Sequence, residues 1–160
     1  MSTTKSPLLA TAESFFSALS ICDMDRVASF LAPEYEHHFL PASSGLGPPV
    51  DRDALIGRFT GLRSIATGVE ITINQSWPND AAHTITLQTT NTPHFKDIVK
   101  RPEDVEGEWD FSIQCMFVLT MDESGEKMVK SIEFVEGPTT EKMMVQVPKA
   151  FQRVGIALGP

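Results

Sequence analysis

The chain has 160 residues, of which 41% are hydrophobic and 21% are charged, a composition typical of a globular domain with a core of its own. Its formal net charge is −8, and its 13 basic residues are scattered along the sequence. We therefore expect no nucleic acid and no anionic membrane surface as a partner, because both need clustered Lys and Arg, and no run of about 18 apolar residues could span a bilayer.

Two helices are predicted first in the chain. Pro7 suits a first helical turn, and the apolar residues that follow it recur with helical spacing: Leu8, Ala12, Phe15, Phe16 and Leu19. Asp23 can cap a second, shorter helix, and Pro33 is expected to stop it. The beginning of the chain therefore predicts one long and one short amphipathic helix.

The N-terminus and the cysteines indicate the cellular compartment. Residues 1–7 lack the basic start and the apolar centre of a secretory signal. Cys22 and Cys115 have neither CxxC nor metal-ligand spacing. We expect a cytoplasmic protein with reduced thiols.

A strand with two adjacent histidines is predicted next, over residues 34–40. Adjacent strand residues point to opposite faces of a sheet, so only one of His37 and His38 should face an interior. A titratable imidazole inside a cavity is where proton-transfer chemistry is expected. The strand pattern leaves open which of the two histidines it is. Gly and Pro residues then mark 42–50 as a loop, after which Asp51 caps a third helix.

Beyond this helix the hydrophobic period changes to two, which predicts four strands. They cover residues 69–74, 82–92, 109–121 and 128–136, with a charged loop at 96–108. On the third of these strands one polar row suits a pocket lining or a subunit interface: Asp110, Ser112, Gln114 and Met116. Residues 138–160 are expected to form a partly helical tail.

This element order resembles the NTF2-like, or SnoaL-like, α+β fold. The stretch His37-His38-Phe39-Leu40-Pro41-Ala42-Ser43 and the final strand Ile132-Glu133-Phe134-Val135-Glu136 are similar to those of small fungal SnoaL-like proteins. The resemblance covers about residues 8–137 of a single domain, 1–160. It implies a cone in which a curved antiparallel sheet wraps around the long first helix and leaves a central pocket. It also implies a homodimer through the outer sheet face.

The resemblance further implies an isomerase or cyclase acting on polyketide or meroterpenoid intermediates, but two known catalytic sets are missing. Ketosteroid isomerases of the superfamily have a carboxylate just before the proline that closes the first strand and a tyrosine on the first helix. Leu40 and Phe15 stand at those places here. Scytalone-type dehydratases use paired tyrosines, whereas Tyr35 is the single tyrosine of this chain.

A histidine–carboxylate pair remains as the predicted machinery. His37 matches the histidine of the fungal relatives, and Glu136 takes the place of their final-strand aspartate. A neutral imidazole can remove a proton, and a carboxylic acid against an apolar wall can return it elsewhere. His38 and Asp110 are further catalytic candidates, and Glu133 is expected to face the cavity or a dimer partner. No cofactor is expected, because such proton transfer needs none, and no metal is expected at His37 and His38, because neighbouring strand residues diverge and no third ligand has suitable spacing.

The pocket is expected between the first helix and the concave sheet, with a volume of roughly 300 Å³ or more. The predicted substrate-binding residues are Phe15, Tyr35, Phe39, Trp77, Trp109, Gln114 and Met116. The predicted function is cofactor-free isomerisation or cyclisation of a small apolar polycyclic molecule. Two alternatives stay open: a non-catalytic ligand-binding or dimerisation module, and a dehydratase or hydrolase on the same fold.

Overall fold

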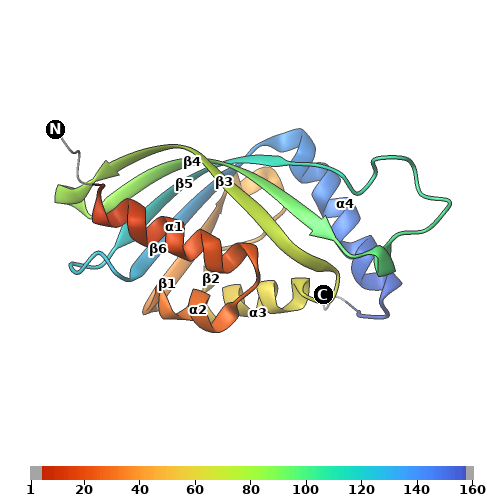
Figure 1. Ribbon diagram of the computed structural model, residues 1–160, viewed down its shortest axis with the longest axis horizontal. Coiled ribbons are helices and arrows are strands. Elements are labelled where there is room, and N and C mark those ends of the chain that lie inside the picture. Colours follow the sequence, from red (N-terminus) through yellow and green to blue (C-terminus); the bar gives the residue numbers. More distant parts are fainter. Residues whose placement is uncertain (1–4, 158–160) are drawn as a thin grey trace.

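The computed structural model describes residues 5–157 (Figure 1). Its helices are α1 (Pro7–Ser20), α2 (Met24–Ser29), α3 (Arg52–Leu62) and α4 (Gly137–Arg153). Its strands are β1 (Leu31–Leu40), β2 (Val50–Asp51), β3 (Ala66–Asn79), β4 (Thr84–Phe95), β5 (Ile113–Met121) and β6 (Met128–Val135). Short 3-10 turns are η1 (Ala42–Ser44), η2 (Asp80–Ala82) and η3 (Asp97–Val99). None of the described helices is long and apolar enough to cross a membrane.

Within the described residues, the six strands form one sheet in the order β2-β1-β6-β5-β4-β3. Strands β3 to β6 are the antiparallel meander that the alternating pattern predicts, whereas β1 runs parallel to β6. This parallel pairing sets His37 beside Ser131 and Phe39 beside Glu133. The β1–β6 pair therefore brings together the side chains of His37 and Glu133, which lie 96 positions apart in the sequence.

The sheet curves around α1, which lies across its concave side (Figure 1). The apolar residues that helical spacing assigns to one face of α1 are all buried: Leu8, Ala12, Phe15, Phe16 and Leu19. The end of α1 approaches β3 so closely that a Cβ atom at Gly68 would lie 2.1 Å from the carbonyl oxygen of Ser20. Glycine at this position lets the helix and the strand meet.

Two predicted boundaries differ from the structure. The second helix ends at Ser29, and Pro33 lies inside β1, where the register with β6 is irregular between Leu31 and Glu36. Pro has no N–H to donate and is tolerated at such an irregularity. Strand β5 begins at Ile113 rather than at residue 109, and Trp109 packs on Phe95 with 5.0 Å between ring centroids.

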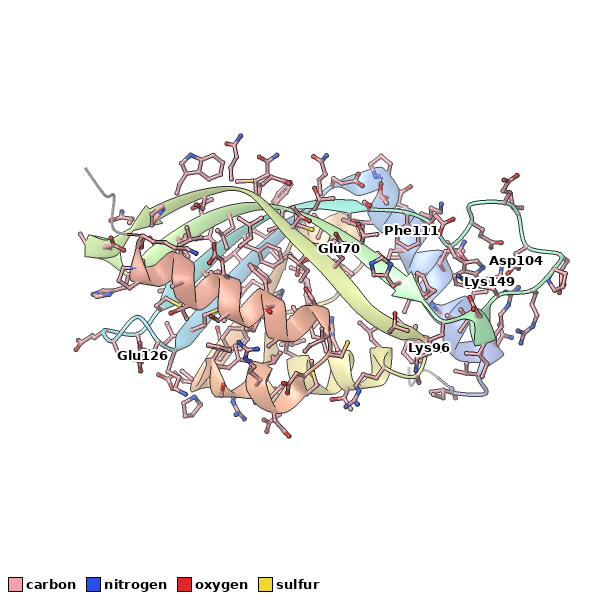
Figure 2. All side chains as sticks on the ribbon, in the orientation of Figure 1. Glu70, Lys96, Asp104, Phe111, Glu126 and Lys149 are labelled. Atoms are coloured by element: carbon pink, nitrogen blue, oxygen red, sulfur yellow. The ribbon has the colours of Figure 1, made fainter. Side chains whose placement is uncertain are left out.

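The segment predicted as a partly helical tail is the continuous helix α4, packed against the core. Ala150 and Phe151 are buried in the core cluster. Arg153 forms two hydrogen bonds of 2.6 Å with the carboxylate of Asp104, in the loop that follows β4. Figure 2 shows Asp104 close to Lys149, whose ammonium group lies 3.6 Å from the carboxylate. Charged contacts with the 96–112 loop thus hold the helix across one end of the cone.

Candidate active site

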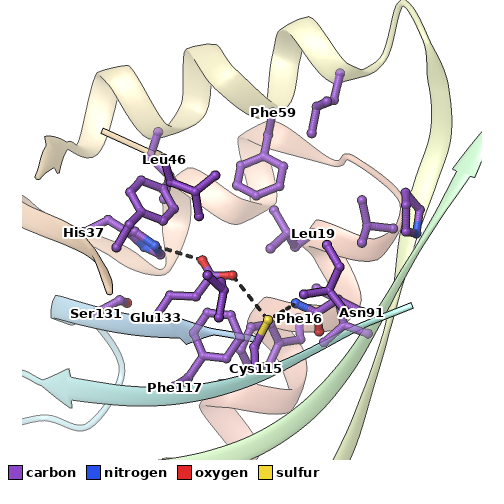
Figure 3. A pocket seen from close by; sticks show the side chains of 18 of the residues that line it. Phe16, Leu19, His37, Leu46, Phe59, Asn91, Cys115, Phe117, Ser131 and Glu133 are labelled. Atoms are coloured by element: carbon purple, nitrogen blue, oxygen red, sulfur yellow. Dashed lines mark hydrogen bonds and ion pairs between the residues drawn. The ribbon is translucent and has the colours of Figure 1, made fainter. Parts of the chain in front are cut away.

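A cavity of about 180 Å³ lies between α1 and the concave face of the sheet. Most of its lining is apolar. Helices α1, α3 and α4 contribute Phe15, Phe16, Leu19, Leu55, Phe59, Leu62, Met143 and Val147. The strands contribute a few polar side chains, which Figure 3 shows close together: His37, Asn91, Cys115, Ser131 and Glu133.

The centre of this polar group is an ion-pair contact between His37 and Glu133. The Nε2 atom of His37 lies 3.0 Å from Oε2 of Glu133. The side chains of His37 and Glu133 are 6% and 18% exposed, so the carboxylate is the more accessible of the two. A titratable pair in an apolar cavity is a strong candidate for acid–base work.

Tyr35 and Ser131 hold the imidazole from its other side. The Tyr35 hydroxyl donates to Oγ of Ser131 at 2.8 Å and lies 3.0 Å from Nδ1 of His37. Burial raises the pKa of Tyr35, so the phenol remains a neutral hydroxyl at ordinary pH. Because its hydrogen points to Ser131, its oxygen is left to accept the Nδ1–H of His37. The Nε2 atom of His37 then faces Oε2 of Glu133 at 3.0 Å.

Cys115 and Asn91 hold the second oxygen of Glu133. The Cys115 thiol donates to Oε1 of Glu133 at 3.6 Å, and Nδ2 of Asn91 donates to the Cys115 sulfur at 3.4 Å. Burial, and next the charge of Glu133, raise the pKa of Cys115, so its thiol stays protonated and able to donate. Thr89 fixes the amide by donating to Oδ1 of Asn91 at 2.8 Å. Both carboxylate oxygens of Glu133 are thereby oriented.

The structure resolves which histidine faces inward. His37 lines the cavity, whereas His38 lies on the opposite face of β1, with its Nε2 atom 3.2 Å from Oε2 of Glu36. Of the predicted substrate-binding residues, Phe15, Tyr35 and Phe39 line the cavity. The ring of Phe39 lies 4.4 Å from that of His37, centroid to centroid.

Glu136 is not the carboxylate beside His37. Strand β6 ends at Val135, and Glu136 instead caps α4, where its side chain accepts from the Thr139 N–H at 3.0 Å. Glu133, two residues inside the strand, takes that place because β6 pairs in parallel with β1. Asp110 is exposed and precedes β5, so it does not reach the cavity either.

The predictions for Trp77, Trp109, Gln114 and Met116 also need correction, since none of them lines the cavity. On β5 the odd-numbered residues Ile113, Cys115 and Phe117 face inward, which leaves Gln114 and Met116 on the outer face. Trp77 is 48% exposed near the end of β3. Trp109 is buried outside the cavity, where its indole N–H donates to Asp104 at 2.9 Å.

The cavity, at about 180 Å³, is smaller than the expected roughly 300 Å³. Met143 and Val147 extend from α4 into the lining. The sequence analysis missed these two residues together with Asn91, Cys115 and Ser131. In residues 5–157, no group of three or more His, Cys, Asp and Glu side chains is placed to hold a metal ion.

Comparison with known proteins identifies the fold. No family model and no curated protein matches the sequence. Among solved structures, AusH from Aspergillus nidulans superposes with a TM-score of 0.69 at 18% identity, covering 83% of this chain and 86% of that one. The BvnE pinacolase from Penicillium brevicompactum gives 0.71 at 15% identity, covering 89% and 93%. A putative SnoaL-like polyketide cyclase from Shewanella denitrificans gives 0.68 at 10% identity, covering 89% and 98%.

These similarities confirm the predicted fold class. The chain has the NTF2-like, or SnoaL-like, α+β fold, with a curved sheet around an N-terminal helix. The expected likeness to small fungal proteins is found in structures from Aspergillus and Penicillium. At these identities the likeness concerns the fold, which hosts many different chemistries.

Proposed function

We propose that this protein is a cofactor-free acid–base enzyme that isomerises or cyclises a small, largely apolar organic molecule. The observation that carries the proposal is the His37–Glu133 contact of 3.0 Å at the wall of an otherwise apolar cavity. Similarity in fold to a pinacolase and to a putative polyketide cyclase supports it.

In the proposed mechanism Glu133 exchanges the proton with the substrate. Its carboxylate takes a proton from a carbon or a hydroxyl of the bound molecule and returns it at a second position. His37 stabilises the carboxylate through Nε2 and is itself oriented by the Tyr35 hydroxyl at 3.0 Å. Such positioned proton transfer contributes about 10²–10⁴-fold in rate. The apolar lining excludes water and so strengthens these interactions.

The size of the cavity limits the substrate. Its volume of about 180 Å³ is close to the roughly 150 Å³ that holds benzene in an engineered protein cavity. A compact molecule of one or two rings fits this space. The polycyclic substrate expected from the sequence requires Met143 and Val147 of α4 to move outward.

Proton exchange in heavy water tests the proposed function. The protein is incubated in D₂O with cyclohexanone, tetralone and a steroid ketone, and loss of the α-proton signals is followed by NMR. We expect catalysed exchange, faster with the smaller ketones than with the steroid ketone. Exchange no faster than with the Glu133→Gln protein, for every ketone, would overturn the proposal.

We also propose that a second copy of the chain covers the outer sheet face. Leu40, Phe134 and Met116 are neighbours across β1, β6 and β5, and each is more than one-third exposed on this side. Unpaired apolar sheet surface of this kind is commonly buried in a homodimer.

Light scattering checks the dimer. We expect a mass of about twice 17.6 kDa, because burying the apolar row removes it from water. Phe134→Lys places a charge in the middle of that row and should give a monomer, while Glu126→Lys, on the exposed turn before β6, should stay dimeric. A wild-type monomer at every concentration would contradict the proposal.

A further inference from the structure

Asn91 has a donor that the protein does not use. It lies on the inner side of β4, is 8% exposed and lines the cavity. Its amide oxygen accepts from Thr89, and its amide nitrogen donates to the Cys115 sulfur. A side-chain amide carries two N–H donors, and the second has no hydrogen-bond partner within residues 5–157. A buried donor left without a partner is costly, so the site is suited to a ligand acceptor.

This donor lies on the same stretch of cavity wall as the proposed base. Figure 3 shows His37, Glu133, Cys115 and Asn91 joined in a continuous series of contacts. The Cys115 sulfur lies 3.6 Å from Oε1 of Glu133 and 3.4 Å from Nδ2 of Asn91. The carboxylate oxygen and the amide nitrogen are therefore no farther apart than these two lengths laid end to end.

A carbonyl compound with an acidic α-hydrogen fits this spacing. Its α-carbon and its oxygen are separated by two bonds, and each requires about 3 Å to reach its protein partner. We infer that Asn91 is a catalytic residue that donates its second N–H to the carbonyl oxygen of an enolisable substrate while Glu133 takes the α-proton. This inference rests on the proposed function and narrows its substrate to enolisable carbonyl compounds.

The step balances without any other reactant. The C–H electron pair becomes the carbon–carbon π bond of the enolate, and the carbonyl π pair moves to the oxygen, which accepts the Asn91 N–H more strongly as its charge grows. Where a β,γ carbon–carbon double bond extends the enolate to a dienolate, Glu133, now a carboxylic acid, returns the proton to the γ-carbon, and the double bond moves into conjugation with the carbonyl. The carbonyl re-forms, and the product is an isomer of the substrate.

A neutral amide suits this place better than a charged donor. Lys or Arg beside Glu133 would form an ion pair with the carboxylate and remove the base from use. The amide is instead fixed by Thr89, which is fully buried, so it is oriented before the substrate arrives. Donors oriented in advance toward developing charge are the most effective form of electrostatic catalysis.

Binding of para-nitrophenol tests the inference. The test uses the Glu133→Gln protein. The new glutamine side chain is neutral, like the protonated acid, and does not repel a phenolate. The phenolate oxygen mimics the enolate oxygen, and its visible absorbance reports the fraction ionised. Para-nitrotoluene has nearly the same shape but no such oxygen, and it is the matched control ligand.

Adding Asn91→Leu should weaken phenolate binding about tenfold or more, since a hydrogen bond to a charged group is lost. It should also raise the pH at which the bound probe ionises and change para-nitrotoluene binding by less than about twofold. Adding Thr89→Val instead keeps the amide but frees its orientation, so it should shift the probe in the same direction by a smaller amount. The Thr89→Val variant also tests the inference if the Asn91→Leu protein does not fold.

Equal losses for the two ligands, or no change in the phenolate in either variant, would overturn the role of Asn91. This test needs no turnover and is therefore separable from the exchange assay in heavy water. If the protein exchanges ketone protons but Asn91→Leu leaves para-nitrophenol binding unchanged, this inference alone is refuted. If Asn91→Leu weakens para-nitrophenol binding but the protein exchanges no ketone protons, the proposed function is refuted and, with it, the catalytic role of the Asn91 amide.

Discussion

Replacing Glu133 with glutamine should lower the rate of proton exchange about 10²–10⁴-fold, the usual cost of losing a general base. Glutamine keeps the shape of the side chain and can still bond to His37 and Cys115, so the cavity should persist. What it lacks is the ability to accept a proton from carbon. The measurement is the rate of α-proton loss in D₂O, with thermal melting to confirm that the variant is folded.

Substitution of His37, with substitutions of His38 and Glu136 as controls, tests the same site. His37→Ala should also lower the rate strongly, because it removes the partner 3.0 Å from Glu133. His38→Ala should change it little, since that ring faces away from the cavity and contacts Glu36. Glu136→Gln should also be mild, because this side chain caps α4. A larger loss in Glu136→Gln than in Glu133→Gln would restore the pairing predicted from the sequence and refute the one proposed from the structure.

The fold could be predicted because its elements are marked locally. Helical spacing identified α1, and alternation of period two identified the four-strand meander. The same local reasoning predicted that one of the two adjacent strand histidines faces inward, and the resemblance to the fungal proteins favoured His37. His38 is therefore on the outer face of the strand, where its side chain is 28% exposed.

The carboxylate partner of His37 could not be found in this way. The choice between Glu133 and Glu136 depends on where β6 ends and on its parallel register with β1, and neither is encoded in a local pattern. Phe134 added to the difficulty, because an aromatic residue in a strand suggests the core, whereas it is 50% exposed here. If the outer face is a dimer interface, that exposure is explained.

The polar side chains around Glu133 were missed for a similar reason. Asn91 and Cys115 face inward on β4 and β5 and meet only because these strands pair. The continuous helix α4 was predicted only as a partly helical tail, because Pro138 and Pro148 interrupt a largely polar sequence. The contacts of α4 with the 96–112 loop are tertiary and are not visible in the segment alone.

A large loss of stability is expected when the contact between Asp104 and Arg153 of α4 is weakened. Asp104→Asn should lower the melting temperature and speed hydrogen exchange in α4, because the Arg153 guanidinium loses the charge that holds it through two bonds of 2.6 Å. The same carboxylate accepts from the Trp109 indole at 2.9 Å and from the Arg101 N–H at 2.8 Å, so one change weakens several links. Since Met143 and Val147 of α4 line the cavity, binding of the larger ketones should improve in this variant.

Asp97→Asn is the matched control for this prediction. Asp97 lies in the same loop, pairs with Lys100 at 3.2 Å and has a 99% exposed side chain. Surface pairs of this kind contribute little to stability. The two aspartates should therefore differ clearly in melting temperature and in exchange of α4. Equal effects would mean that the Asp104 contact does not hold the helix.

Acid should reproduce the effect of Asp104→Asn. The hydrogen bonds from Arg153, followed by those from Trp109 and the Arg101 backbone, hold the pKa of Asp104 well below its usual 3.8. A carboxyl group whose pKa is lower in the folded state stabilises the fold fully above its unfolded pKa, and this contribution is lost as the pH falls toward the native value. The wild-type melting temperature should thus begin to fall below about pH 4. The Asp104→Asn protein should show a shallower fall over the same range, and parallel pH profiles would show that another group causes the acid sensitivity.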